Sequence, residues 1–366
     1  MKFPSQKNRR SPLRAKILLL PVFILASALI CPTHAAPKAK KPAPILSAAR
    51  KKPAPSKVPV VLGQNQMAGE NAQFGTAYTL GKDSPMNFTL RTAQFSIEAL
   101  NYDTSSEVPT KDQKLLVLHF TAHNPMKSEQ HLDWMSFRFT VVDALDNNHE
   151  NMRFVAREGT NNTVRVALKP AQKIDVWTAV LVPARVALPK LIVASEESGL
   201  PVLRYDLRGK VKGIDAPFAD PSDATGATVA AQVPAKKGAF NPLGAFAARL
   251  ENVAYTKEAL NEQAPEEGKR YLTAIFTLKN TSNSEQHFDW GKFIATLIDA
   301  DSEKVEYNQS LLKANRDEKA RSKLNPGEEA KVRFFFILPE KTAGKTVLLR
   351  EGEEGRTFAF EVPSTP

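Results

Sequence analysis

The feature that most constrains the fold of this chain is an internal repeat. Residues 115–144 read LLVLHFTAHNPMKSEQHLDWMSFRFTVVDA, and residues 271–300 read YLTAIFTLKNTSNSEQHFDWGKFIATLIDA. The two segments align without a gap at an offset of 156 residues, and fourteen of their thirty positions are identical. Each copy extends over roughly 120 to 140 residues, the size of an ordinary domain. The repeat therefore predicts two tandem domains and not a solenoid of short units.

Within each copy, apolar and polar residues alternate with a period of two. The even positions of the first copy's strand are Leu116, Leu118, Phe120 and Ala122, and their counterparts are Leu272, Ala274, Phe276 and Leu278. This period predicts half-buried antiparallel strands whose odd positions face solvent. Turn residues such as Asn124-Pro125 and Pro326-Gly327 separate the strands, and no long helical pattern is present. The sequence therefore predicts an all-β fold of two tandem antiparallel β-sandwiches.

The positive charge of the chain is concentrated at its N-terminal end. The chain has 50 Lys and Arg against 39 Asp and Glu, and residues 1–60 hold thirteen of the bases and no acid. Residues 1–36 combine a basic start, an apolar run over Ile17–Ile30 and small residues up to Ala36. These are the parts of a secretory signal peptide, cut after Ala35 or Ala36. We expect a secreted or periplasmic protein with no transmembrane span after cleavage, because the run is shorter than the roughly 20 residues that a spanning helix needs.

Residues 37–71 form the expected disordered tail, which is rich in Lys, Pro and Ala. Two roles stay open for it: an electrostatic tether to an anionic envelope polymer or lipid headgroup, and a spacer. Without residues 1–60 the chain has 37 bases and 39 acids, which argues against nucleic-acid binding. We place domain 1 at residues 72–209, a linker of moderate freedom at 210–239 and domain 2 at 240–366.

The residues that carry the repeat resemble a known family. Each copy has an apolar strand ending in F-T-x-x-N, a polar turn, an aromatic-containing loop and then F-x-x-x-[VL]-[VI]-D-A. Asn124 and Asn280 fit the first motif, and Asp143 and Asp299 fit the second. This pattern is similar to the telokin-like, immunoglobulin-like domains of unknown function found in secreted bacterial proteins. The resemblance implies an immunoglobulin-like sandwich without catalytic residues.

The repeated run SEQH-x-DW lies outside that family pattern and supplies the candidate site. Its members are Glu129, His131, Asp133 and Trp134 in the first copy, and Glu285, His287, Asp289 and Trp290 in the second. One interpretation is structural: the Trp plugs the end of the sandwich while Asp and His bind the loop backbone. The other is ligand or metal contact, since a carboxylate beside a His can orient a base or bind a cation.

We assign no catalytic residue, metal or cofactor from the sequence. The only cysteine, Cys31, lies in the predicted signal peptide, and no phosphate-binding or zinc-binding motif is present. The predicted function is a non-catalytic binding or structural module of the bacterial cell envelope, with a protein or an anionic envelope polymer as partner. Two rival functions are an assembly chaperone that uses a free sheet edge, and a hydrolase with a site between the domains.

Overall fold

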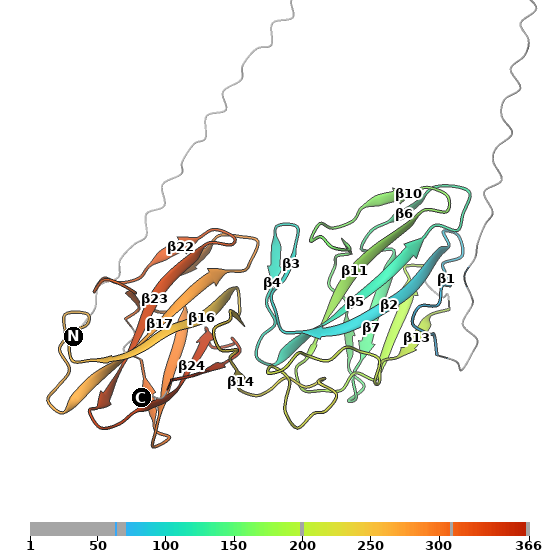
Figure 1. Cartoon of the computed structure of the whole chain (residues 1–366). Helices are drawn as coiled ribbons and strands as arrows, with labels where there is room; N and C mark the ends of the chain where they lie inside the picture. Colours follow the sequence, from blue (N-terminus) through green and yellow to red (C-terminus); the bar gives the residue numbers. More distant parts are fainter. Residues whose placement is uncertain (1–62, 64–70, 198–200, 308–309, 364–366) are drawn as a thin grey trace, which may run out of the picture. The chain divides into compact units, whose positions relative to one another are not determined.

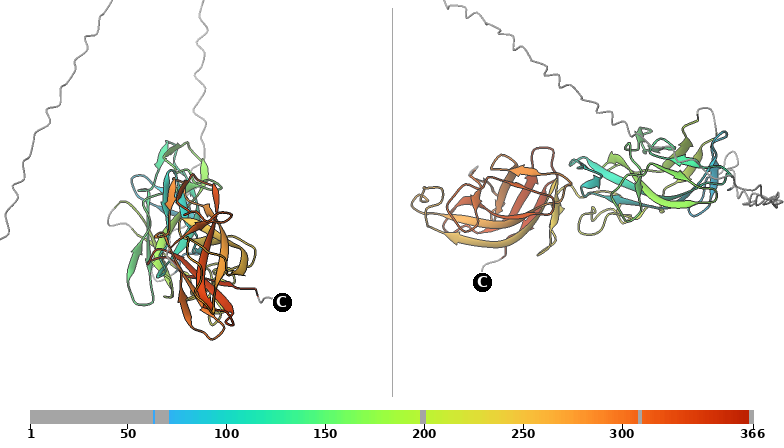
Figure 2. Two further views of the ribbon diagram at one scale, coloured as in Figure 1. Left: turned by 90° about the vertical axis from the view of Figure 1, so that its left-hand side faces the viewer. Right: turned by 90° about the horizontal axis from the view of Figure 1, so that it is seen from above.

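The computed structural model describes residue 63 and residues 71–197, 201–307 and 310–363. The predicted signal peptide and nearly all of the predicted tail lie outside these residues. Every regular element in the described part is a β-strand, as Figures 1 and 2 show from three directions. None of the described residues forms a helix long and apolar enough to cross a membrane. The all-β fold class is confirmed.

The first sandwich consists of a five-stranded sheet and a four-stranded sheet. Their strand orders are β1-β2-β5-β11-β9 and β13-β12-β7-β8. The bounds are β1 Tyr78–Leu80, β2 Met86–Ser96, β5 Gln113–His123, β7 Phe137–Val142, β8 Asn148–Glu150, β9 Ala156–Arg157, β11 Lys173–Pro183, β12 Lys190–Ser195 and β13 Leu203–Asp206. The small pairs are β3 (Leu100–Tyr102) with β4 (Ser105–Glu107), and β6 (Gln130–Leu132) with β10 (Val166–Leu168). The two large sheets bury one shared apolar core between them.

The second sandwich repeats this order of strands. Its sheets are β15-β16-β17-β23-β21 and β14-β25-β24-β19-β20, with the small pair β18-β22. The bounds are β14 Val233–Pro234, β15 Asn241–Leu243, β16 Phe246–Thr256, β17 Lys269–Asn280, β18 Gln286–Phe288, β19 Phe293–Asp299, β20 Lys304–Glu306, β21 Leu312–Lys313, β22 Ser322–Leu324, β23 Glu329–Pro339, β24 Gly344–Glu351 and β25 Phe358–Glu361. Even the parallel contact recurs: Ala72 bridges to β13 in the first sandwich, and β14 pairs with β25 in the second.

The alternation read from the central strands is confirmed on one face only. All the even positions named above are fully buried in both copies. The expectation of a solvent-facing odd side is wrong, because Leu115, Val117, Tyr271, Thr273 and Thr277 are also buried. Apolar clusters outside the main cores cover part of this outer face: Phe154 and Trp177 pack there in copy one, and Leu312 and Phe335 in copy two.

A buried asparagine closes the loop end of each sandwich. The Asn124 side chain donates to the carbonyls of Ser128 and Leu168, both at 2.8 Å, and accepts from the amide of Met126. Asn280 makes the same contacts with Ser284, Leu324 and the amide of Ser282. One side chain thereby joins the end of the central strand to the polar turn and to β10 or β22.

Residues 210–239, the predicted linker, contain several buried side chains. Ile214, Phe218, Val229 and Val233 are buried and belong to the apolar core that contains the second sandwich. The ammonium of the fully buried Lys114 donates to the carbonyls of Ala184, Val186 and Ala227, the last within this segment. Burying these groups ties the segment to both its neighbours in sequence, because apolar burial and hydrogen bonding each favour one fixed conformation.

We expect Asn124→Ala and Asn280→Ala each to lower the free energy of unfolding by about 2 to 4 kcal/mol, since two carbonyls lose a buried donor. Urea unfolding measures this. Asn124→Asp, which keeps the acceptor and loses the amide donor, is expected to cost a similar amount. Asn315→Ala, at an exposed position, is the control. Equal stability of the Asn124→Ala and control variants would contradict the role of the buried amide.

The buried Lys114 predicts a pH dependence of stability. Burial lowers the pKa of Lys114 from 10.5 to about 8. The unfolded chain holds this proton until about pH 10.5 while the folded chain releases it near pH 8, so a rise in pH across this window favours folding. Relative to Lys114→Met, the unfolding free energy of the parent chain should rise between these pH values by up to about 3 kcal/mol. Parallel pH profiles of the two proteins would show that Lys114 does not titrate there.

Candidate functional site

The repeated motif lies on a small strand pair at one end of each sandwich. In the first copy β6 pairs with β10, with His131 opposite Ala167, and in the second β18 pairs with β22, with His287 opposite Lys323. On these strands Leu132 and Phe288 point into the cores, so their neighbours His131 and His287 point outward. The motif therefore has the same burial pattern in both copies, with only its apolar position inside.

The aspartate of each motif organises the loop that follows the strand. Asp133 Oδ1 accepts from the amide of Met135 at 2.9 Å, and Asp289 Oδ1 accepts from the amide of Gly291 at 2.9 Å. The Ser136 hydroxyl accepts from the amide of Asp133 at 3.0 Å. These are the local turns that short acidic side chains form with their own backbone. We name residues 133–136 and 289–292 the Asp-Trp loops.

The tryptophans of the two loops are exposed, so the expectation that they plug the ends of the sandwiches is wrong. Trp134 is 41% exposed and Trp290 is 52% exposed, and Met135 beside the first is 40% exposed. Their loops turn away from the core because the aspartate turn directs the chain outward after the buried Leu132 or Phe288. The third tryptophan, Trp177, is only 8% exposed and donates to the carbonyl of Thr160.

Basic side chains stand beside the two exposed rings. The guanidinium of Arg153 lies over Trp134, 5.9 Å from the ring centroid. Trp290 and Asp289 line a cavity of about 460 Å³ together with Ser310, Lys319 and Arg321. Arg321 precedes β22 as Arg165 precedes β10, so an Asp, a Trp and an Arg recur in both copies at the same offset of 156 residues.

The hydroxyl of Tyr307 fixes the second loop by donating to the carbonyl of Trp290 at 2.5 Å. Burial raises the pKa of Tyr307, so it stays a hydrogen-bond donor throughout the physiological range. The Trp290 ring is thus held on an anchored backbone while its own surface remains open.

The glutamates and histidines of the motif do not form one centre with the tryptophans. Glu129 and His131 line a separate cavity of about 590 Å³ with Glu196 and Glu197. In the second copy Glu285 pairs with Lys323 at 2.7 Å and with His287 at 3.6 Å. Neither histidine donates to the loop backbone in a hydrogen bond of the described structure. Among the described residues no group of three or more His, Cys, Asp or Glu side chains could hold a metal ion.

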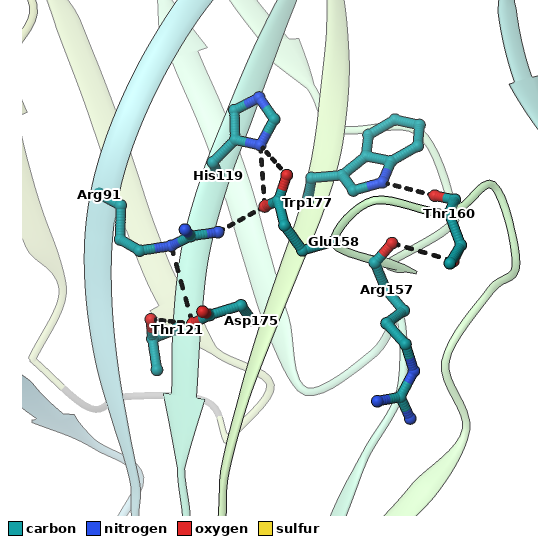
Figure 3. A network of polar contacts seen from close by, with 8 residues as sticks. All are labelled: Arg91, His119, Thr121, Arg157, Glu158, Thr160, Asp175 and Trp177. Atoms are coloured by element: carbon teal, nitrogen blue, oxygen red, sulfur yellow. Dashed lines mark hydrogen bonds and ion pairs between the residues drawn. The ribbon is translucent and has the colours of Figure 1, made fainter.

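A second polar cluster lies on the outer face of β2, β5 and β11, and Figure 3 shows it from close by. The Glu158 carboxylate pairs with Arg91 and with His119 Nδ1, the latter at 3.0 Å. Arg91 also lies 3.8 Å from Asp175, which accepts from the hydroxyl of Thr121. Sequence reasoning missed this cluster because its members come from four separate segments.

The corresponding position of the second sandwich carries the opposite charge. Arg91 sits at a β-bulge between Leu90 and Thr92, and Glu251 sits at the same bulge of β16. There Glu251 accepts from the hydroxyl of Thr277, and this hydrogen bond, followed by Arg249 and Lys331, lowers the pKa of Glu251. Because the charge at this position is reversed between the copies, the cluster around Arg91 is not a repeated feature of the two sandwiches.

The geometry of the motif gives a test of its histidines. Because both side chains are exposed, His131→Ala combined with His287→Ala should change the melting temperature by no more than about 1 °C. Leu132→Ala, which empties a fully buried position on the same strand, should lower stability by about 2 to 5 kcal/mol. A large loss in the double histidine variant would restore the structural interpretation of these residues.

The second copy of the repeat matches a protein family model. Residues 245–355, within the predicted domain 2, match the model of a domain of unknown function, DUF4352. No curated protein matches the chain. The telokin-like resemblance and the family match of the first copy stay predictions.

Three solved structures are similar to about a third of the chain, with a TM-score of 0.27 in each case. An uncharacterised β-sandwich protein from Clostridium difficile is 16% identical over 36% of this chain and 93% of its own. A putative lipoprotein from Bacillus subtilis is 14% identical over 36% of this chain and 40% of its own. A secreted protein from Mycobacterium tuberculosis, MPT63, is 12% identical over 36% of this chain and 97% of its own.

Proposed function

We propose that this chain is an exported, non-catalytic binding module of the cell envelope, and that its two Asp-Trp loops hold an anionic polymer. The observation that carries the proposal is the exposure of Trp134 and Trp290 at the same position of both copies. Large aromatic side chains that remain on the surface, supported by an ordered loop, are typical of contact sites.

The surroundings of the rings favour an anionic partner that also presents an apolar face. Arg153 lies over Trp134, and Lys319 and Arg321 line the cavity beside Trp290. An aromatic ring offers a flat apolar surface, and neighbouring cations attract carboxylate or phosphate groups. A polysaccharide that carries acidic groups combines both properties.

The N-terminal region adds to this proposal through its sequence. Its signal-like residues 1–36 direct export, and the tail after them carries seven bases and no acid up to residue 60. Two binding sites and a basic tail on one chain bind a repetitive polymer more tightly than one site does, because each contact makes the next one intramolecular.

Binding of polygalacturonate, an anionic polysaccharide, tests the proposal, with dextran as the neutral control. Trp134→Ala combined with Trp290→Ala should weaken binding of polygalacturonate at least tenfold, which is about 1.4 kcal/mol. The melting temperature should stay close to that of the parent, because both rings are largely exposed. Leu145→Ala, at a side chain that is 70% exposed, is the matched control and should bind normally.

The same titration at rising salt tests the tail. Deletion of residues 37–59 should weaken binding at low salt and flatten its salt dependence. Unchanged binding by the double Trp variant, or equal affinity for dextran, would contradict the assignment of the loops to an anionic polymer.

A further inference from the structure

The cavity of about 590 Å³ beside the motif of the first sandwich has an apolar part and an acidic part. Leu80, Met86 and Phe137 supply the apolar part with side chains that belong to the core. The lining residues that can carry a charge are Glu129, His131, Glu196 and Glu197. Among the described residues that line it there is no lysine or arginine. We name this space the glutamate cavity.

Two of the three glutamates have no partner in the protein. Glu197 accepts from the amides of Lys82 at 2.7 Å and Ser84 at 3.1 Å, and the charge of Lys82 also acts on it. Glu197 therefore holds the connection between β1 and β2. Glu129 and Glu196 are exposed and form no hydrogen bond or ion pair within the described part of the chain. Their carboxylates are free to bind a cationic ligand.

A buried hydroxyl group at the same cavity also has no partner. Ser195 lines the cavity and is only 8% exposed, and its Oγ has no hydrogen-bond partner. A buried polar group without a partner costs free energy, and a serine oxygen can accept a hydrogen bond as well as donate one. A ligand that brings a hydrogen-bond donor to Ser195 removes this cost.

Glu351 stands in the second sandwich where Ser195 stands in the first. Ser195 pairs with Phe137 in the register of β12 and β7, and Glu351 pairs with Phe293 in the register of β24 and β19. Phe137 and Phe293 are counterparts at the offset of 156 residues. The two sandwiches can therefore be compared side chain by side chain at this place.

The second sandwich carries its own cation there. Lys292 replaces Ser136 at the same offset, and its ammonium pairs with Glu351 at 2.7 Å. The first sandwich has two serines instead of this pair, Ser136 and Ser195, and both line the glutamate cavity. Its free carboxylate belongs to Glu196, one residue further along the chain. The first sandwich thus keeps an acid at this place and lacks the lysine.

A second lysine is missing from the first sandwich in the same way. In the second sandwich the ammonium of Lys323 pairs with Glu285 at 2.7 Å. The first sandwich keeps the acid as Glu129 but has Ala167 at the register position of Lys323. Two ammonium groups that the second sandwich supplies from its own chain are therefore absent at the glutamate cavity.

We propose that the glutamate cavity binds an aliphatic diamine, whose two ammonium groups take the places that Lys292 and Lys323 hold in the second sandwich. One ammonium pairs with Glu129, and the other pairs with Glu196 and donates to the Ser195 hydroxyl. The apolar lining contacts the methylene chain between them. No three of the described His, Cys, Asp or Glu side chains could hold a metal ion, so two separated charges fit this site better than one metal cation.

Calorimetric titration of the full chain with putrescine tests the proposal. We expect saturable binding of a single putrescine per chain, because the second sandwich already holds its own lysines. Butylamine has the same carbon chain with only one ammonium group, and it should bind about fivefold more weakly. Glu129→Gln and Glu196→Gln should each weaken putrescine binding about threefold, and together about tenfold. Glu98→Gln is the control, at an exposed position beyond the other end of β2 from Met86.

Variants that restore the missing lysines give the sharpest test. Ala167→Lys provides the partner that Glu285 has in the second sandwich, and Ser136→Lys combined with Ser195→Glu rebuilds its buried pair. Both proteins should lose putrescine binding, because a cation of the chain then occupies the place of the ligand. Thermal melting confirms that they fold. Ala167→Lys changes only a partly exposed side chain, so it remains informative if the double variant does not fold.

Three outcomes would overturn the proposal. Equal binding of putrescine by the Glu129→Gln and Glu196→Gln double variant would place the ligand elsewhere, and equal affinity for butylamine would show that one ammonium is sufficient. Binding of putrescine only after deletion of residues 37–59 would show that lysines of the chain itself occupy the cavity.

The Asp-Trp loops give an independent readout. Trp134→Ala combined with Trp290→Ala should leave putrescine binding unchanged while it weakens binding of polygalacturonate. The failure of the diamine proposal can therefore be distinguished from the failure of the polymer proposal.

Discussion

A buried asparagine side chain is the contact on which the loop end of each sandwich depends. Asn124 and Asn280 stand at the end of the central strand, and each donates both of its amide hydrogens, one to a carbonyl of the polar turn and one to a carbonyl of β10 or β22. These two bonds fix the polar turn and the small strand pair that carries the motif. The position of the Asp-Trp loops follows from this, because Leu132 and Phe288 enter the core immediately beyond the turn. An amide can serve here where a carboxylate cannot, since only the amide donates.

The two copies share these contacts of the buried asparagine and differ in some of the residues around them. Both keep the exposed tryptophan, the aspartate turn and a following arginine, and these shared features carry the polymer proposal. The bulge of the second strand keeps its place while its charge is reversed, from Arg91 to Glu251. In the first copy the edge of that strand bonds to the main chain of Lys212.

Much of the fold could be predicted from the sequence because its signals are local. Alternation at Leu116, Leu118 and Phe120 requires a strand with one inward face, and turn residues mark where such strands end. The prediction of a solvent-facing odd side failed at Leu115 and Tyr271, since the segments that cover them come from elsewhere in the chain. The burial of Ile214, Phe218 and Val233 in the predicted linker was not foreseen for the same reason: these residues show no periodicity, yet they lie in the packed core.

The sequence by itself determined the duplication, the all-β class and the residues of the repeated motif, because identity at a fixed offset and a period of two are visible without any contact. The tertiary structure alone decided which of those residues face water. A tryptophan within a motif is predicted to lie in the core because its side chain is large. Only the turn that the aspartate forms after the buried Leu132 directs it outward. The bridge between Gln94 and Lys212 at the edge of β2 likewise has no signal in the local pattern, because it joins residues that are far apart in the sequence.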